Sequence, residues 1–443
     1  MKLNEKRFFE LAKESGLESA DLSVSESGSL SVSLFHGEID SFTNNNSYEL
    51  VARGIYKGKM GAIRVDNVNK DSPKYLVNGI KRAASIIEND DPVFIYKGSE
   101  KYHKKNVSKN TDFSENIQEK VGILKEIEKK LLAFDKRINE VITVGFDASS
   151  HAYKKTNSYG LKLSQKMTTY AYYAQVSAKE GEDIRTGFQV FASFDENEFK
   201  IDEFVEKVAN DALEKLGSVQ CDSKKYPVVL NPECVATLLG FLISSLDAEE
   251  IQKHTSLLEG KLNQQVLSKK LTVVENPLAK NIFFKYFDDE GVATEKKYLF
   301  NKGVVSTYLY TLQTAAIDGV KPTGNGYGSG AKAKADVGFI EVKGGRKSEE
   351  EMISEIKEGV YLTELQGLHS GMNAHSGNFS LQCSGFMIRD GKKAEPLALI
   401  TVADNLLNVF NNIKCVANNN KLVISNQTSC PSLLIGKMSI SGK

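Results

Sequence analysis

A chain of 443 residues exceeds what one hydrophobic core usually organises, so we expect two domains of roughly 200 residues each. Basic and acidic side chains balance at 57 each, and lysines alternate with glutamates along most of the chain, so the composition gives no support to direct nucleic-acid binding. The five cysteines are scattered and form no C-x-x-C pair, which argues against a disulfide framework and against a cysteine-based metal cluster.

The N-terminal sequence predicts a short amphipathic helix over residues 3–15. It is charged from its second residue and lacks the apolar stretch of a secretory signal, so we expect a cytoplasmic protein. In residues 22–24 and 30–34 apolar residues then alternate with polar ones, mostly serines, in the two-residue period of half-buried strands. Gly28 is the predicted turn between these two strands.

Further strands and helices complete the predicted first domain. Residues 48–56 and 59–65 read as a strand pair joined by a tight turn at Lys57-Gly58. Residues 141–193 are rich in Thr, Tyr, Val and Phe and predict more strands. Apolar residues at helical spacing predict helices over 72–87, over 117–131 and, capped by Asp202, over 202–216. The sequence therefore indicates a mostly antiparallel sheet with helices.

A polar linker at residues 217–225 precedes the apolar strand 226–230, which places the domain boundary at 221/222. The fold class is α+β, with an N-terminal domain (1–221) and a strand-rich mixed C-terminal domain (222–443). Helices of the second domain are expected at 234–246, 308–317, 348–357 and 403–411. The first of these is the longest uncharged stretch, about half the length that spans a bilayer, so it predicts a buried core helix and no membrane segment.

Common catalytic motifs are missing from the sequence, which holds no G-x-S-x-G, no G-x-x-x-x-G-K-[ST] and no H-E-x-x-H. We therefore assign no catalytic residue. Residues 323–330 read TGNGYGSG, but no βαβ pattern surrounds them, which argues against a dinucleotide site. Glycine at every second position suits close approach of another backbone, as in peptide capture by strand addition, and a merely flexible loop is the alternative.

His369 and His375 are the closest histidine pair, and their separation matches no helical metal pair, in which ligands sit three to five residues apart. A structural role for His369 and a functional one both stay open.

Several segments, taken in order, resemble one protein family. GLHSGMN (367–373), SGNFS (376–380), ITVADNL (400–406), DEGVAT (289–294) and PTGNG (322–326) match its patterns, as does the tail from Pro431. On these motifs the chain is identified as a member of the TldD/PmbA family, also called modulators of DNA gyrase. The resemblance implies peptide binding, for which the candidate residues are Thr323, Gly324, Asn325, Gly326, His369, Ser370, Gly371 and Asn373.

Catalytic members of that family resemble zinc peptidases that carry H-E-x-x-x-H on the helix after a V-V-L-x-P strand, with a cysteine near the C-terminus as a further ligand. On this chain the three motif positions fall on Gly240, Phe241 and Ser245, and the cysteine position falls on Cys430. Glycine, phenylalanine and serine cannot replace two imidazoles and a general base. The resemblance therefore implies the PmbA/TldE-like branch, with no metal or other cofactor in this chain.

The expected function is that of a PmbA/TldE-like subunit of a heteromeric zinc metallopeptidase that acts on unfolded or leader peptides. The zinc is expected in a TldD-like partner subunit, and a homodimer is one state open to the isolated chain. Two alternatives remain: a peptidase active alone through an unrecognised site, and a non-enzymatic protein that modulates gyrase or toxin targets.

Overall fold

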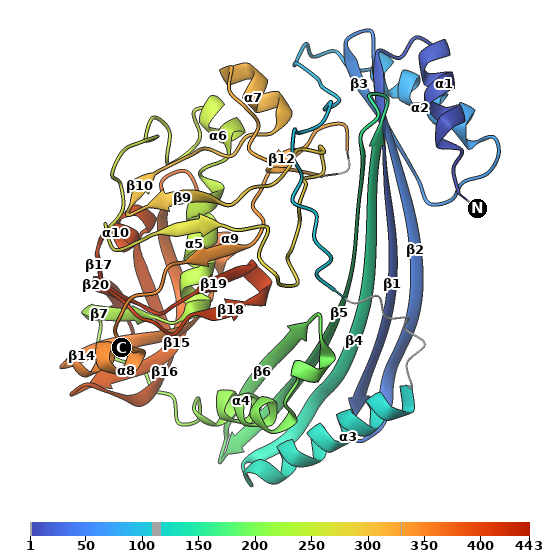
Figure 1. Ribbon diagram of the computed structural model, residues 1–443. Helices are drawn as coiled ribbons and strands as arrows, with labels where there is room; N and C mark the ends of the chain where they lie inside the picture. Colours follow the sequence, from blue (N-terminus) through green and yellow to red (C-terminus); the bar gives the residue numbers. More distant parts are fainter. Residues whose placement is uncertain (1, 109–116, 329) are drawn as a thin grey trace.

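The first half of the chain forms one six-stranded antiparallel sheet in the order β3-β2-β1-β4-β5-β6 (Figure 1). The computed structural model describes residues 2–108, 117–328 and 330–443. The strands are β1 (Ser19–Phe35), β2 (Glu38–Tyr56), β3 (Lys59–Val65), β4 (Ile138–Asn157), β5 (Lys162–Glu180) and β6 (Asp183–Ser193). The antiparallel sheet that the sequence predicts is confirmed.

Strand β1 corrects the turn predicted at Gly28. The strand runs unbroken for 17 residues, and Gly28 pairs with Asn46 on one side and Ser150 on the other. Two flanking ladders therefore hold Gly28 in extended backbone and override its local preference for a turn. The turn to β2 lies instead at His36-Gly37, where both residues have positive φ (51° and 75°). The tight turn at Lys57-Gly58 is confirmed.

Four helices pack on the sheet as two separate cores, with α1 and α2 at one end and α3 and α4 at the other (Figure 1). Leu22 of β1 belongs to the first core and Val32 of the same strand to the second. The N-cap of α4 is Lys200, so the cap predicted at Asp202 is wrong; Asp202 lies in the first turn, where its charge suits the helix dipole. The helices are α1 (Glu5–Glu14), α2 (Ser72–Ser85), α3 (Ile117–Phe134) and α4 (Ile201–Leu213).

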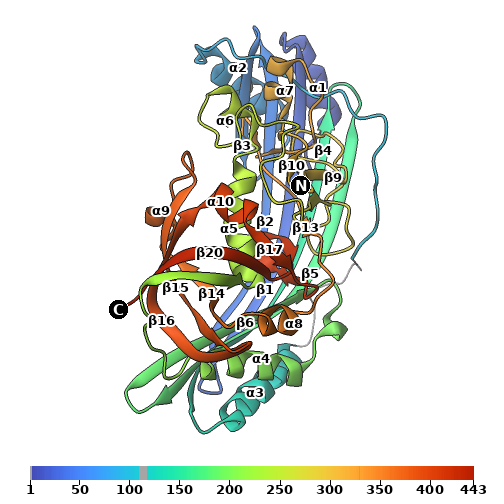
Figure 2. The same cartoon turned by 90° about the vertical axis from the view of Figure 1, so that its left-hand side faces the viewer.

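The second half of the chain holds two six-stranded sheets that share a core with helix α5 (Pro232–Ser244). One sheet, in the order β16-β15-β14-β7-β20-β17, closes on itself because β16 also pairs with β20. Figure 2 shows its curled strands at one end of this half. Its members are β7 (Lys224–Leu230), β14 (Glu358–Gln366), β15 (Asn378–Arg389), β16 (Lys392–Asn405), β17 (Ile413–Val416) and β20 (Leu433–Ser441).

The other sheet runs in the order β10-β9-β8-β13-β19-β18, and a separate two-stranded hairpin pairs β11 with β12. The α+β class with a mixed C-terminal sheet is thus confirmed. The strands are β8 (Val273–Glu275), β9 (Lys297–Asn301), β10 (Val304–Val305), β11 (Gly326–Tyr327), β12 (Lys334–Ala335), β13 (Ile340–Val342), β18 (Lys421–Val423) and β19 (Thr428–Cys430).

The buried helix predicted at 234–246 is α5, whose Val235, Leu239 and Leu242 are fully buried. The helix predicted to begin at residue 308 begins later, because Thr311 caps it through the backbone N–H of Thr314. Among the described residues, no helix is long and apolar enough to cross a membrane. The remaining helices are α6 (Ala248–Gln252), α7 (Leu312–Asp318), α8 (Glu349–Ser354), α9 (Leu368–Gly371) and α10 (Leu406–Asn411).

An extended strap, residues 87–107, runs between the long sheet and the C-terminal half without forming a helix or strand (Figure 1). The Tyr102 hydroxyl donates to the Gly291 carbonyl (2.7 Å), and the Ala293 N–H donates to the Ser99 hydroxyl (3.0 Å). The strap therefore ties residues 291–293 of the second half to the first. The predicted boundary at 221/222 lies just before β7.

Candidate functional site

Helix α5 carries the positions that the resemblance aligns with the zinc motif. It begins at Asn231, whose side-chain oxygen accepts from the Cys234 N–H (2.8 Å), and Pro232 follows at the first helical position. Its apolar face is buried in the core of the C-terminal half, and Gly240 lies on the exposed side. The helix is thus anchored rigidly, with one face turned outward.

The three motif positions differ in exposure and none carries a metal-binding or basic side chain. Gly240 is exposed, Phe241 is half-buried against the core, and Ser245 is buried with its hydroxyl 3.4 Å from the Phe241 carbonyl. A Cβ atom on Gly240 would lie 3.9 Å from Nδ2 of Asn426. Asn426, in the short turn before β19, is therefore the side chain beside Gly240, and the sequence analysis did not identify it.

Cys430 packs against the first two turns of α5, where its thiol lies beside the backbone of Pro232 and of Ala236. Its thiol donates to the Pro232 carbonyl at 3.1 Å, and burial, together with the nearby Glu233, raises the pKa of the thiol to about 12. Gly240 lies four residues beyond Ala236, about 6 Å further along the helix axis. Cys430 is therefore a buried neutral thiol. Within the ranges that the structure describes, no three His, Cys, Asp or Glu side chains gather as metal ligands would; the absence of zinc from this chain stays a prediction.

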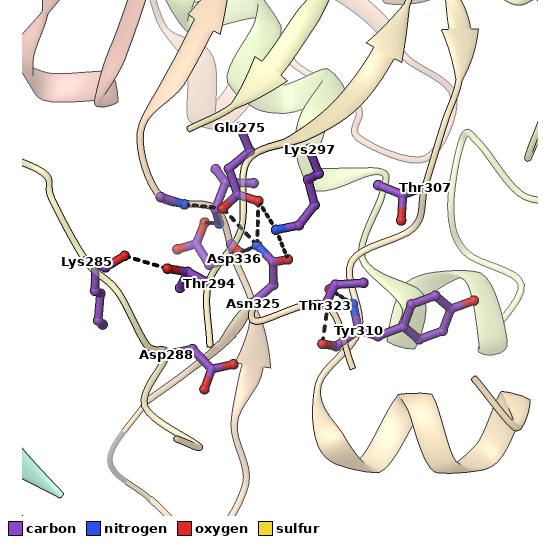
Figure 3. A network of polar contacts seen from close by, with 12 residues as sticks. Glu275, Lys285, Asp288, Thr294, Lys297, Thr307, Tyr310, Thr323, Asn325 and Asp336 are labelled. Carbon is purple, nitrogen blue, oxygen red and sulfur yellow. Dashed lines mark hydrogen bonds and ion pairs between the residues drawn. The ribbon is translucent and has the colours of Figure 1, made fainter. Parts of the chain in front are cut away.

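Asn325, in the glycine-rich segment, is fully buried in a polar network (Figure 3). Its amide nitrogen donates to the Glu275 carboxylate (2.9 Å) and to the Asp336 carbonyl (2.7 Å), and Lys297 reaches both Glu275 (2.5 Å) and the Asn325 amide oxygen (3.1 Å). The side chain of Asn325 thus satisfies a buried carboxylate inside the fold.

The neighbours of Asn325 are also engaged within the chain. The Thr323 hydroxyl accepts from the Tyr310 N–H (2.8 Å), and the Gly326 N–H donates to the Asp288 carboxylate (2.9 Å). A Cβ atom would lie 2.6 Å from the Ala293 carbonyl oxygen at Gly324 and 2.1 Å from the Glu290 carboxylate at Gly326. Gly324 therefore permits the close approach of another backbone, and Gly326 that of a side chain, and both groups belong to the chain's own loop around residues 288–294.

The second candidate segment is an exposed loop. His369 and Ser370 are exposed in the single turn α9, whereas Gly371 packs closely on the Ser380 carbonyl. The Asn373 side chain accepts from the backbone N–H groups of His375 and Ser376 and so fixes the turn that follows. Between the described residues, no hydrogen bond joins this loop to Thr323–Gly326. The eight candidates thus fall into one internal group and one surface group.

A cluster of buried charges lies between the two halves, and the sequence analysis did not assign it. Asp21 of β1 accepts from Arg53 of β2 (3.0 Å) and pairs with Lys155 of β4 (2.9 Å), and all three side chains are buried. Burial alone would raise the pKa of Asp21, but Arg53 and Lys155 lower it to about 2. The register places Asp21 directly opposite Arg53. In the sequence, a charged residue inside each of two apolar strand segments was the signal that could have indicated this ion pair.

Two carboxylates of the second half face this cluster. Burial, and then the neighbouring Glu290, raise the pKa of Asp288 to about 7, and burial raises the pKa of Glu290 as well. Asp288 accepts from the N–H groups of Glu290 (3.0 Å) and Val292 (2.8 Å), and Glu290 accepts from the N–H of Leu312 (2.8 Å). Two carboxyl groups with raised pKa values therefore lie at the contact between the halves.

The comparisons with known proteins agree with the sequence motifs. Residues 223–442 match the "PmbA/TldA metallopeptidase C-terminal domain" and residues 111–216 match the "PmbA/TldA metallopeptidase central domain". The chain belongs to the PmbA/TldD metallopeptidase family. The resemblance found in the sequence is thus confirmed.

Relatives in the PmbA/TldD family match along nearly the whole chain. The metalloprotease PmbA of Escherichia coli O157:H7 is 25% identical, covering 96% of this chain and 92% of the relative. A protein named as a modulator of DNA gyrase from Thermotoga maritima is 27% identical, with a TM-score of 0.89 and 99% of both chains covered. TldE from Thermococcus kodakarensis, at 21% identity and a TM-score of 0.88 over 99% of this chain and 100% of the other, shares the fold.

Two PmbA/TldD motifs meet in one structural unit. The Asp289 N–H donates to the Gly326 carbonyl (2.9 Å), and Gly326 in turn donates to Asp288, so the DEGVAT and PTGNG segments hold each other. This unit lies against Lys155, because a Cβ on Gly291 would approach its side chain within 3.4 Å. These motifs therefore build the contact between the halves.

A wide cleft of about 1030 Å³ opens between strand β6 and the C-terminal sheets. On one wall the side chains of Ile184, Phe188 and Val190 are all exposed, and Leu399 of β16, 70% exposed, lines the other. Pro232 and Glu233, at the start of α5, reach the same cleft. Exposed apolar side chains gathered in one cleft are typical of a binding surface.

Proposed function

We propose that this chain is the PmbA/TldE-like subunit of a heteromeric metallopeptidase, in which it helps to hold peptides while another chain supplies the zinc. The observation that carries the proposal is the outward face of α5. Gly240 and Phe241 stand there in place of the histidine and glutamate of the zinc motif. The helix itself follows the expected V-V-L-x-P sequence, at residues 228–232.

The chemistry of peptide hydrolysis explains why a second chain is needed. A zinc peptidase requires a Lewis acid held by several imidazole, carboxylate or thiolate ligands and a general base beside the attacking water. Gly240 has no side chain, Phe241 is apolar, and the adjacent Asn426 carries a neutral amide. This donor set does not fit zinc, so we derive no hydrolytic step on this chain.

Peptide binding is the contribution that the chain can make. The cleft beside β6 has room for several residues of an extended peptide, and its apolar row Ile184, Phe188 and Val190 suits the side chains that unfolded proteins expose. The exposed loop at His369 and Ser370 offers a second, polar contact. Unfolded or leader peptides are the substrate class that such surfaces favour.

The test is peptide hydrolysis by this chain alone, by a TldD-like subunit alone, and by their mixture, each with and without a chelator. We expect metal-dependent cleavage that is much faster in the mixture than in either subunit. Cleavage by this chain alone, unchanged by the chelator, would overturn the proposal. The variant Phe188→Asp should weaken peptide binding by the mixture, whereas Ile317→Asp, at an exposed apolar residue outside the cleft, should not.

The variant His369→Ala tests whether the exposed loop at His369 takes part in peptide binding. Reduced cleavage by the mixture would assign His369 to the peptide path, and His254→Ala, at an exposed histidine of another loop, is the matched control. Full activity of His369→Ala would remove that residue alone from the site.

A further inference from the structure

Part of the buried charge cluster between the halves lines a small cavity. This cavity, of about 150 Å³, lies between the strap, strands β2 and β3 and the start of α7, and it shares no lining residue with the cleft beside β6. Arg53 of the first half and Glu290 of the second, only 4% and 6% exposed, belong to its lining. Ile87 and Phe94 of the strap also line it and are 38% and 42% exposed, so the cavity opens to solvent beside them.

Arg53 and Glu290 each keep one polar atom that the protein does not engage. Arg53 donates to Asp21 through Nε (3.0 Å) and Nη2 (2.5 Å). Oε2 of Glu290 accepts from the Leu312 N–H (2.8 Å). Between described residues, no hydrogen bond or ion pair reaches Nη1 of Arg53 or Oε1 of Glu290. Neither atom is among the buried side-chain atoms without a partner, so both contact open space, and the cavity is the space that the two residues share.

The two charged groups are close to each other without touching. Against the effect of burial, Asp21 and then Glu290 raise the pKa of Arg53, so Glu290 lies within electrostatic range of the guanidinium. Among the ion pairs of the described residues, however, none joins Arg53 to Glu290. A guanidinium binds carboxylates, and a carboxylate binds ammonium groups. The pair therefore suits a ligand that carries both groups on neighbouring atoms, as an α-amino acid does.

The remainder of the cavity is suited to a short apolar side chain. Its two lysines already pair with carboxylates outside the lining, Lys59 with Asp90 and Lys332 with Glu249. A volume of 150 Å³ is about ten times the space that one water molecule needs, and apolar cavities of about this size bind molecules as large as benzene. Apolar residues from the strap and both halves line it: Met60, Val93, Phe94, Leu312 and Ala333.

We propose that this cavity binds a free α-amino acid with a small apolar side chain, such as valine. The ligand's carboxylate accepts from Nη1 of Arg53, its ammonium group donates to Oε1 of Glu290, and its side chain packs on the apolar lining. Because Arg53 and Glu290 belong to different halves, the ligand binds only when the halves are in contact. It should therefore raise the melting temperature of the chain.

Three probes of nearly equal size test the two ionic contacts on the unmodified chain. L-valine carries both charged groups, isovalerate lacks the ammonium group, and isobutylamine lacks the carboxylate. By titration calorimetry, we expect one L-valine per chain at millimolar concentration. Each analogue leaves one buried charged group unpaired and should bind about tenfold more weakly. No binding of L-valine, or equal binding of L-valine and isovalerate, would overturn the proposal.

Two variants place the binding in this cavity. Glu290→Gln should weaken L-valine binding about tenfold without weakening isovalerate binding, because only the ammonium contact is lost. Phe94→Ser, which removes an exposed ring from the lining and leaves the ionic groups in place, should also weaken L-valine binding. Phe134→Ser is the matched control, since Phe134 is equally exposed (42%) but lies at the end of α3, and its affinity should be unchanged. Full affinity for L-valine in Glu290→Gln or in Phe94→Ser would overturn the proposal.

Discussion

Helix α5 and the loop at residues 288–294 carry motifs of the same family but differ in chemistry. On α5, two of the positions that the resemblance aligns with the zinc motif hold Gly240, which is exposed, and Phe241, which is half-buried. The loop instead holds Asp288 and Glu290, two buried carboxylates that face Arg53, Asp21 and Lys155 of the long sheet. Five buried charged residues therefore lie together at the contact between the halves, whereas α5 packs into the core of the second half.

This difference separates two ways in which a motif segment contributes to the fold. On α5 the apolar positions Val235, Leu239 and Leu242 pack the helix into the core. In the loop the charged residues themselves build the contact. Experiments on α5 should therefore change stability alone, whereas experiments on the loop should change how stability depends on pH.

The largest expected effect is at Leu239, which is fully buried in α5. Leu239→Asp places an unpaired charge in the core and should destabilise the C-terminal half by several kcal/mol, or prevent its folding. The matched control is the adjacent, exposed Gly240→Asp, which should fold. Thermal unfolding followed by circular dichroism distinguishes the two. An unchanged melting temperature for Leu239→Asp would show that α5 does not pack as described.

An effect of intermediate size is expected from the loop at residues 288–294, on the pH dependence of stability. Because the pKa of Asp288 in the folded chain is about 7 and its ordinary value is 3.8, the folded state binds a proton that the unfolded state releases. That stabilisation is fully present below pH 4 and is lost as the pH rises through 7. With the ionisation of other groups held fixed, this site should lower the melting temperature by a few degrees between pH 6 and 8.

The variant Glu290→Gln sharpens this prediction. The glutamine keeps an oxygen that can accept from the Leu312 N–H. The substitution removes the negative charge of Glu290, which helps to raise the pKa of Asp288. The fall in melting temperature between pH 6 and 8 should become smaller. Glu295→Gln, at an exposed residue that follows in the same segment, is the control and should leave the pH dependence unchanged. An identical slope in Glu290→Gln would contradict the coupling of the two carboxylates.

The smallest expected effect is at Gly240 itself. A glycine inside an exposed helical turn costs about 1 kcal/mol relative to alanine, and a Cβ atom here meets only Asn426, at an ordinary contact distance of 3.9 Å. Gly240→Ala should therefore stabilise the chain by about 0.5–1 kcal/mol in urea denaturation. A loss of stability would show that the glycine is required by the fold.

The sequence predicted those parts of the fold that depend on local patterns. The helical spacing of Val235, Leu239 and Leu242 located α5, and the turn at Lys57-Gly58 followed from its position between two apolar runs. Gly28 was misread because its pairing with Asn46 and Ser150 comes from distant segments. Local preference cannot report such long-range ladders.

The candidate site was less accessible to sequence analysis for the same reason. Asp21, Arg53 and Lys155 come from three strands, and only the register of the sheet brings them together. The role of the glycines at 324 and 326 was predicted in part. The sequence predicted close approach of another segment, but it did not indicate that this segment is the loop at 288–294. Family motifs marked both segments without indicating that they contact each other.

The central claim is that this chain belongs to a metallopeptidase family but does not itself carry the zinc, and the metal content of the purified chain tests it most directly. Elemental analysis after mild chelation, at known protein concentration, should give far less than one zinc per chain, because Gly240, Phe241 and Ser245 offer no zinc ligands. A TldD-like subunit treated in the same way is the positive control. About one zinc per chain that survives the chelator would contradict the account.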